Sequence, residues 1–129
     1  MIEILPAPPH VAAFQFSGTL DGDDYDRCIA EIEARLGEYR RIGLYADMSG
    51  FSGMSAAAIG KDLRYAVAKL GDYDRFARGA VVTERDWLGK VSEMAGKLLP
   101  GTEVRAFAPG EQAQALQWAA DIAKHDDDA

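Results

Sequence analysis

A short, nearly continuous apolar run, Ile42–Asp47 with the sequence IGLYAD, is the feature that most restricts how this chain can fold. Such a run is typical of a central strand in a parallel sheet, where both faces of the strand are buried. Parallel strands must be joined by crossover connections, and helical patterns both precede and follow this run. The run therefore predicts an α/β fold with a mostly parallel sheet.

The rest of the chain supplies the other elements of such a sheet. The patterns predict strands at 1–5, 11–18, 75–83 and 102–107, and helices at 19–39, 59–70, 84–99 and 111–124. The order is β-β-α-β-α-β-α-β-α, with right-handed crossovers between parallel strands. Because only the Pro6–Pro9 turn separates the first two strands, the first is expected to be an antiparallel edge strand.

Hydrophobic periodicity predicts which faces are buried. On the second strand Ala12, Phe14 and Phe16 share one face, opposite Gln15 and Ser17, which predicts one apolar face. The helical stripes expected to face inward are Tyr25, Ile29, Ile32 and Leu36; Ile59, Leu63, Ala66, Val67 and Leu70; Leu88, Val91, Met94, Ala95 and Leu98; and Leu116, Ala119 and Ile122 or Ala123. We expect a single domain over 1–124 and a disordered acidic tail over 125–129.

Composition limits the function. The 129 residues carry a formal net charge of -7, and binding to nucleic acid or to an anionic membrane surface requires clustered Lys and Arg instead. Cys28 is the single cysteine, so no internal disulfide forms, and its apolar neighbours predict a core thiol. The sequence has no signal-peptide segment and no membrane-length apolar run, so a cytoplasmic protein is expected.

The Gly/Ser-rich stretch after the central strand raises the question of a serine nucleophile. A nucleophile elbow has the pattern Gly-x-Ser-x-Gly, whereas residues 50–54 read Gly-Phe-Ser-Gly-Met, with the second glycine one residue early. The available bases, His10 and His125, lie beside the proline turn and in the acidic tail, and neither follows a strand end. A hydrolase using Ser52 is therefore a distant third hypothesis.

A phosphate-binding loop and a metal site are also weakly supported. Gly50 and Gly53 precede a helix, but no phosphate-loop pattern is present, and Lys61 lies well inside that helix. The glycines are better interpreted as supplying turn geometry, with Ser55 as the helix N-cap. The acidic clusters at 21–24 and 83–86 are interpreted as helix caps, since a calcium-loop frame is missing.

An apolar cleft is an alternative for the same edge of the sheet. Trp87 follows a strand end, where parallel sheets bind ligands, and Phe51 and Met54 are expected on the neighbouring loop. The three side chains either line such a cleft, cover the end of the sheet, or form an oligomer contact.

Three segments carry a resemblance to a known family. They are Asp47 with the Gly/Phe/Ser loop that follows, YDRFARGAVVTERDW at 73–87, and EVRAFAPGEQAQALQWA at 103–119. With the element order, they make the chain resemble the SpoIIAA-like proteins, a bacterial group described as STAS/CRAL-TRIO-like. The resemblance covers about residues 2–123 and implies the SpoIIAA-like fold.

The resemblance implies two kinds of function. STAS anti-sigma-factor antagonists bind a partner kinase through the loop after the third strand, and phosphorylation of a serine there ends the binding. Laid over this chain, that phospho-acceptor falls on Ala56, and the acidic residue before it falls on Ser55, so the switch of those relatives is absent. CRAL-TRIO carriers instead hold an apolar ligand in a pocket, for which this shorter chain has less material.

Together, the residues and the resemblance predict a cytoplasmic, non-enzymatic regulatory or protein-binding module without catalytic residues, cofactor or metal. The alternative is a small apolar-ligand or lipid-binding protein with a cleft at the carboxyl ends of the parallel strands. The partner is an unknown protein or an apolar small molecule, and a homodimer is compatible with the sequence. The predicted binding residues are Asp47, Ser49, Phe51, Ser52, Met54, Ser55, Glu84 and Trp87.

Overall fold

A computed structural model of the chain describes residues 1–68, 75–84 and 102–122. Its elements are β1 (Ile2–Ile4), β2 (Val11–Leu20), α1 (Gly22–Glu38), β3 (Ile42–Met54), α2 (Ala56–Ala68), β4 (Phe76–Val82), β5 (Glu103–Phe107) and α4 (Gln112–Ala120). This order matches the predicted one over the described residues. The helix predicted at 84–99 and the tail at 125–129 lie outside them.

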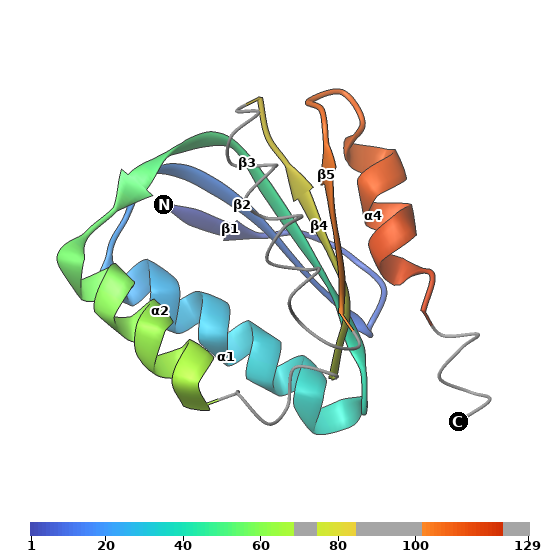
Figure 1. Ribbon diagram of the computed structural model, residues 1–129, viewed down its shortest axis with the longest axis horizontal. Helices are drawn as coiled ribbons and strands as arrows, with labels where there is room; N and C mark the ends of the chain where they lie inside the picture. Colours follow the sequence, from blue (N-terminus) through green and yellow to red (C-terminus); the bar gives the residue numbers. More distant parts are fainter. Residues whose placement is uncertain (69–74, 85–101, 123–129) are drawn as a thin grey trace.

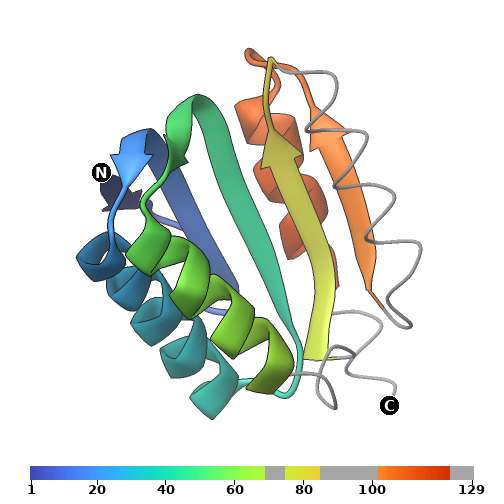
Figure 2. The same cartoon turned by 60° about the vertical axis from the view of Figure 1, so that its left-hand side comes forward.

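The five strands form one sheet in the order β1-β2-β3-β4-β5. β1 pairs with β2 in antiparallel register, and all the other neighbouring pairs are parallel. The mostly parallel sheet and its antiparallel edge strand are therefore confirmed. Helices α1 and α2 lie side by side on one face of the sheet, and α4 lies on the other (Figures 1 and 2).

Two apolar cores fill the two faces of the sheet. On the α1 side, Cys28, Ile32 and Leu36 pack with buried side chains of the sheet, which include Phe14 and Ile42. Cys28 is thus a core thiol, as predicted.

The second core lies on the α4 side, where Ala115 and Ala119 pack with Val11, Ala13 and Tyr45. The first part of β2 is therefore buried on both faces, and the prediction of a single apolar face was too narrow. This second face was not predicted because its valine and alanine side chains are smaller than the phenylalanines of the first face, so it was interpreted as the less apolar of the two.

The α4 helix approaches the sheet closely at Gly43. A Cβ atom built on Gly43 would lie 2.1 Å from the backbone oxygen of Ala119. Only glycine at this position lets the helix backbone rest against β3, with the small Ala115 and Ala119 side chains in contact with the strands.

The first helix begins with a capping box. The Asp21 carboxylate accepts a hydrogen bond from the Asp24 backbone N–H at 2.8 Å, and the Asp24 carboxylate accepts one from the Asp21 N–H at 3.1 Å. The pKa of Asp24 is lowered, first of all by the hydrogen bond with the Asp21 backbone. The acidic cluster at 21–24 thus caps a helix, as the sequence predicted.

Candidate functional site

The stretch predicted as a strand-to-helix loop is largely a continuation of β3. β3 runs without a break from Ile42 to Met54, and residues 50–54 pair with β2 through Ser17–Leu20. The loop assignment was therefore wrong. Glycine and serine are poor strand formers, but parallel pairing with β2 holds these residues in an extended conformation. Figure 1 shows that β3 bends along its length and ends next to α2.

Two bulges in β3 produce this bend. Between the pairs Gln15–Asp47 and Ser17–Gly50, β3 advances one residue more than β2, and this happens again between Gly18–Phe51 and Thr19–Gly53. Each extra residue bends the bulged strand locally.

The sequence predicts that the glycines of this stretch supply turn geometry, but they do not. Neither Gly50 nor Gly53 has a positive φ, whereas Gly18 on the partner strand has φ +61°. The conformation that requires glycine therefore falls on β2, opposite Phe51.

Asp47 holds the first bulge in place. Its side chain is buried, and its Oδ1 atom accepts hydrogen bonds from the Ser49 backbone N–H at 3.0 Å and from the Ser49 hydroxyl at 2.7 Å. This closed turn satisfies the Ser49 N–H group at the point where β3 gains a residue. Asp47 and Ser49 thus shape the backbone of the predicted site.

Ser55 caps α2, as predicted. Its hydroxyl oxygen accepts a hydrogen bond from the Ala58 backbone N–H at 3.2 Å, and its own backbone N–H donates to the Leu20 carbonyl at 2.8 Å. The residue therefore joins the end of β2 to the start of α2.

The remaining predicted residues are placed differently. Ser52 and Glu84 are exposed, the latter just beyond the end of β4. Phe51 is half-buried and packs against the core on the α1 side, while Asp47 follows Tyr45 on the α4 side. The predicted site is thus divided between the two faces of the sheet. Trp87 and the side chain of Met54 lie outside the described residues, so the apolar cleft they were to form remains a prediction.

The proposed base His10 does not lie near Ser52. One ring nitrogen of His10 is 2.7 Å from the Ala120 carbonyl oxygen, and the His10 backbone carbonyl accepts from Gly43 at the beginning of β3. Ser52 lies at the far end of the same strand. His10 therefore cannot activate Ser52, and His125 lies outside the described residues.

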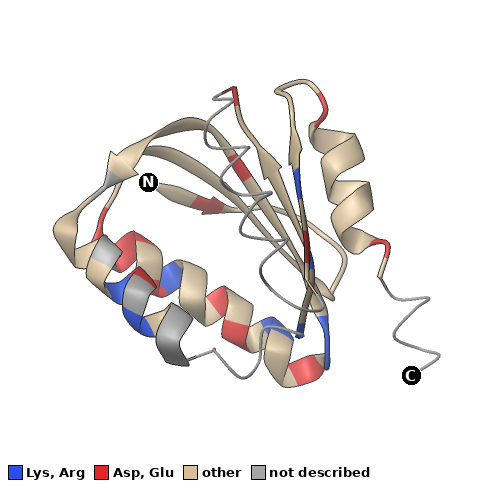
Figure 3. Cartoon of the chain, viewed as in Figure 1, with Lys and Arg blue, Asp and Glu red and all other residues tan. Residues whose placement is uncertain are grey.

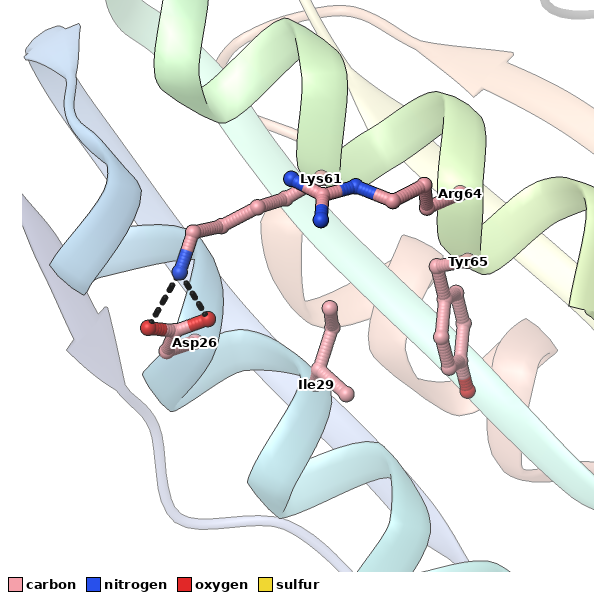
Figure 4. Close-up of a pocket in the computed structure, with 5 residues that line it drawn as sticks. All are labelled: Asp26, Ile29, Lys61, Arg64 and Tyr65. Atoms are coloured by element: carbon pink, nitrogen blue, oxygen red, sulfur yellow. Dashed lines mark hydrogen bonds and ion pairs between the residues drawn. The ribbon is translucent and has the colours of Figure 1, made fainter.

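A groove lies between α1 and α2 that was not predicted from the sequence. It has a volume of about 340 Å³ and is lined by Asp26, Ile29, Lys61, Arg64 and Tyr65. Figure 4 shows the Lys61 ammonium at the Asp26 carboxylate, with Nζ–O distances of 2.7 and 2.6 Å. The sequence does contain a pattern that indicates this groove. Asp26 with Ile29, and Lys61 with Arg64, are three residues apart, which places each pair on one helix face.

Hydroxyl and thiol groups lie close to this groove. The Tyr25 hydroxyl donates a hydrogen bond to Asp62, and burial followed by this hydrogen bond raises the pKa of Tyr25. Burial likewise raises the pKa of Tyr65, and that of Cys28 to about 12. These groups stay protonated at neutral pH, and the Cys28 thiol is not a nucleophile there.

The described residues form neither a metal-binding cluster nor a membrane-spanning helix. Within 1–68, 75–84 and 102–122, no group of three or more His, Cys, Asp or Glu side chains is arranged to hold a metal ion. None of the helices in these ranges has the length and apolar character that a membrane crossing requires.

A solved structure supports the fold. An uncharacterized protein of the DUF3478 family from Shewanella loihica PV-4, described as having a SpoIIAA-like fold, superposes with a TM-score of 0.71. The match covers 93% of each chain at 24% sequence identity. At this identity the likeness concerns the fold alone.

A curated relative matches a smaller part. The D-alanine–D-alanine ligase of Streptococcus equi subsp. zooepidemicus (strain H70) is 34% identical over 92 residues, which is 71% of this chain and 24% of the ligase. The chain thus spans about a quarter of the ligase, and the ligase activity is not carried over.

The family comparison agrees with the sheet order and with the resemblance found in the sequence. The family model described as SpoIIAA-like matches residues 11–120, from the first residue of β2 to the last residue of α4. The chain therefore belongs to the SpoIIAA-like family.

Proposed function

We propose that this protein is a non-enzymatic, regulatory protein-binding module, and that its partner contacts the end of β3 and the residues around it. We call this surface, which consists of residues 48–54, the β3 extension. Ser49, Gly50 and Ser52 are exposed along it, and Glu84 is exposed just beyond the end of β4.

The observation that carries the proposal is how the polar groups of this region are used. The Asp47 carboxylate accepts two hydrogen bonds from Ser49, and the Ser55 hydroxyl accepts one from the start of α2. These groups fix the backbone and leave an ordered, exposed strand. Such a surface suits recognition of another molecule, because an interface that is already formed costs less to order on binding.

Two activities of the same region are less well supported. Ser52 has no histidine beside it among the described residues, because His10 lies at the opposite end of β3. The phospho-acceptor position of the STAS relatives corresponds to Ala56 in this chain. Ser55 is half-buried, and its hydroxyl oxygen accepts the capping hydrogen bond of α2. Of Ser52 and Ser55, the exposed Ser52 is the one accessible to a kinase.

Site-specific cross-linking in the native cell tests the proposal. A photo-crosslinking amino acid replaces Ser52 in one variant and Ala34, an exposed residue of α1, in the matched control. We expect one defined protein adduct from position 52 and none from position 34. The adduct is identified by mass spectrometry and the partner is then purified.

The purified partner must bind the unmodified protein, and Ser52→Arg must weaken that binding by about 10-fold or more while Ala34→Arg leaves it unchanged. Equal adducts from the two positions, or unchanged binding by Ser52→Arg, would contradict the proposal. Ester hydrolysis that disappears in Ser52→Ala would show an enzyme instead.

The second candidate, an apolar-ligand carrier, has weaker support. The groove described above lies between α1 and α2 rather than at the strand ends, and three of its five lining residues, Asp26, Lys61 and Arg64, are charged. A carrier would gain thermal stability from fatty acids after delipidation, because a ligand selective for the native state stabilises it.

A further inference from the structure

Among the described residues, the β3 extension has one open edge. The pairing between β3 and β4 ends at Asp47 with Val82, whereas β3 continues to Met54 alongside β2. In the part of the chain that the structure describes, no strand pairs with the other side of residues 48–54. Figure 1 shows this end of β3 bending away from β4, next to β2.

We propose that the β3 extension binds its partner by strand addition, with an extended segment of the partner continuing the line of β4. An unpaired strand edge presents a row of backbone N–H and C=O groups. Only another extended backbone can form hydrogen bonds with all of them at once. This inference rests on the proposed function and specifies how the same surface binds.

The open edge lacks the features that protect the outer edges of this sheet. Edge strands are commonly kept short or given charged side chains, so that they do not pair with other chains. β1 has three residues and includes Glu3, and β5 carries Glu103 and Arg105. The β3 extension contains no charged residue and no proline, and Figure 3 shows its described part uncharged.

The two bulges limit the length of the added strand. They lie between Asp47 and Gly50 and at Ser52, so regular pairing is interrupted within the extension. A short segment therefore fits better than a long one, and we expect micromolar or weaker affinity for the backbone contacts alone.

Charge defines the occupant further. Glu84 is exposed where the added strand would meet the end of β4, and Asp21 is exposed directly after Leu20, which pairs with Met54. Glu84 thus stands at the β4 end of this uncharged strand, Asp21 lies on its β2 side beyond the other end, and the chain has a net charge of -7. The fitting partner is a short extended segment with uncharged residues in its centre and Lys or Arg at its flanks.

Peptide titrations monitored by amide NMR test the inference. The probe is the end-blocked heptapeptide Lys-Thr-Val-Thr-Val-Thr-Lys, and its control has the same side chains with alternate backbone nitrogens methylated. The parent peptide is expected to shift the amide signals of residues 48–53, and the methylated peptide to bind at least about 10-fold more weakly, since it lacks the donors that a strand needs.

Matched variants locate the contact. Ser52→Lys adds a charge to the open edge and is expected to weaken parent-peptide binding about 10-fold, while Ala34→Lys on α1 leaves it unchanged. Equal binding of the two peptides, shifts centred on β5 or on the α1–α2 groove, or no shift up to about 1 mM peptide would overturn the inference.

Failure of this inference is distinguishable from failure of the proposed function. If Ser52 cross-links a partner whose binding Ser52→Arg weakens while the two peptides behave alike, the binding module stands and strand addition is wrong. If the cross-linking experiment gives no specific partner, the proposed function itself is wrong.

Discussion

Individual residues in this protein are constrained by backbone contacts more than by their chemical groups. Gly43 is required because Ala119 touches the strand, and Gly18 because it has a positive φ. Gly50 and Gly53, which the sequence analysis singled out, have neither constraint. The glycines that attract attention in the sequence are therefore not the ones on which the fold depends.

Substitution of glycine by alanine separates these two groups. Gly43→Ala is expected to destabilise the protein by about 3 kcal/mol or to prevent folding, because the new methyl group would overlap the backbone oxygen of Ala119. Gly53→Ala is the matched control, since no atom lies within 4 Å of its added Cβ. Chemical denaturation measures both variants, and similar losses of stability would contradict the close approach of α4.

Burial of Cys28 predicts slow alkylation of its thiol. Burial raises the pKa of Cys28 from 9.0 to about 12, so the thiolate is rarer in the folded protein than in the unfolded chain. Iodoacetamide at pH 8 should therefore modify the folded protein at least about 100-fold more slowly than the urea-unfolded protein. Comparable rates in the two states would show that Cys28 is accessible.

The same burial predicts the direction of the alkaline pH dependence. Tyr45 also has a raised pKa, from 10.0 to about 12, mainly through burial and then through the charge of Asp47. For both groups the folded state favours the protonated form. Their contribution to stability is therefore full below about pH 9 and is lost as the pH rises toward 12. Urea midpoints measured between pH 8 and pH 11 should fall, and a constant midpoint would contradict this burial.

At the scale of elements, the pairing of β3 with its neighbours determines the structure of the predicted site. The first half of β3 lies between β2 and β4 and has the apolar pattern of a buried strand. Among the described strands its second half pairs with β2 alone, and its sequence is typical of a loop. Pairing with a neighbouring strand outweighed the turn preference of glycine and serine, which is a tertiary effect that a single sequence does not reveal. The cap at Ser55, by contrast, is local, and local capping patterns were read correctly.

The Asp47 turn can be tested through its two hydrogen bonds. Asp47→Ala removes the acceptor for the Ser49 N–H and hydroxyl groups, and we expect a loss of about 1–3 kcal/mol in unfolding free energy. Asp47→Asn keeps a side-chain oxygen for the Ser49 N–H and should retain most of that stability. Equal effects of the two substitutions would indicate that the carboxylate charge matters instead of the turn.

At the scale of the whole molecule, much of the fold could be predicted from the sequence. The strand and helix order and the parallel sheet followed from apolar runs that are local and long enough to recognise, and the antiparallel edge followed from the short Pro6–Pro9 turn. The burial of both faces of β2 was missed because α4, which covers Val11 and Ala13, lies far along the chain. The α1–α2 groove was missed for the same reason, since its residues come from two helices.

The candidate site was predicted less completely than the fold. Its place at the end of β3 was chosen from the Gly/Ser pattern and the family resemblance, while its form as a strand with an open edge depends on where β4 ends. That end is set by the pairing of Asp47 with Val82, and no local pattern marks it. Phe51 was grouped with Asp47 in one binding loop, but the bulge before Phe51 places its side chain against the α1-side core, on the other face of the sheet.

Amide hydrogen exchange of the native protein tests the open β3 edge most directly. Amides of residues 42–47 should be protected, because this part of β3 is paired on both sides. Within 48–54 we expect two classes of amide, those bonded to β2 protected and those facing the open edge exchanging at least about 100-fold faster. Uniform protection across 48–54 would show that the edge is covered, and uniformly fast exchange would show a loop; either result would contradict the account.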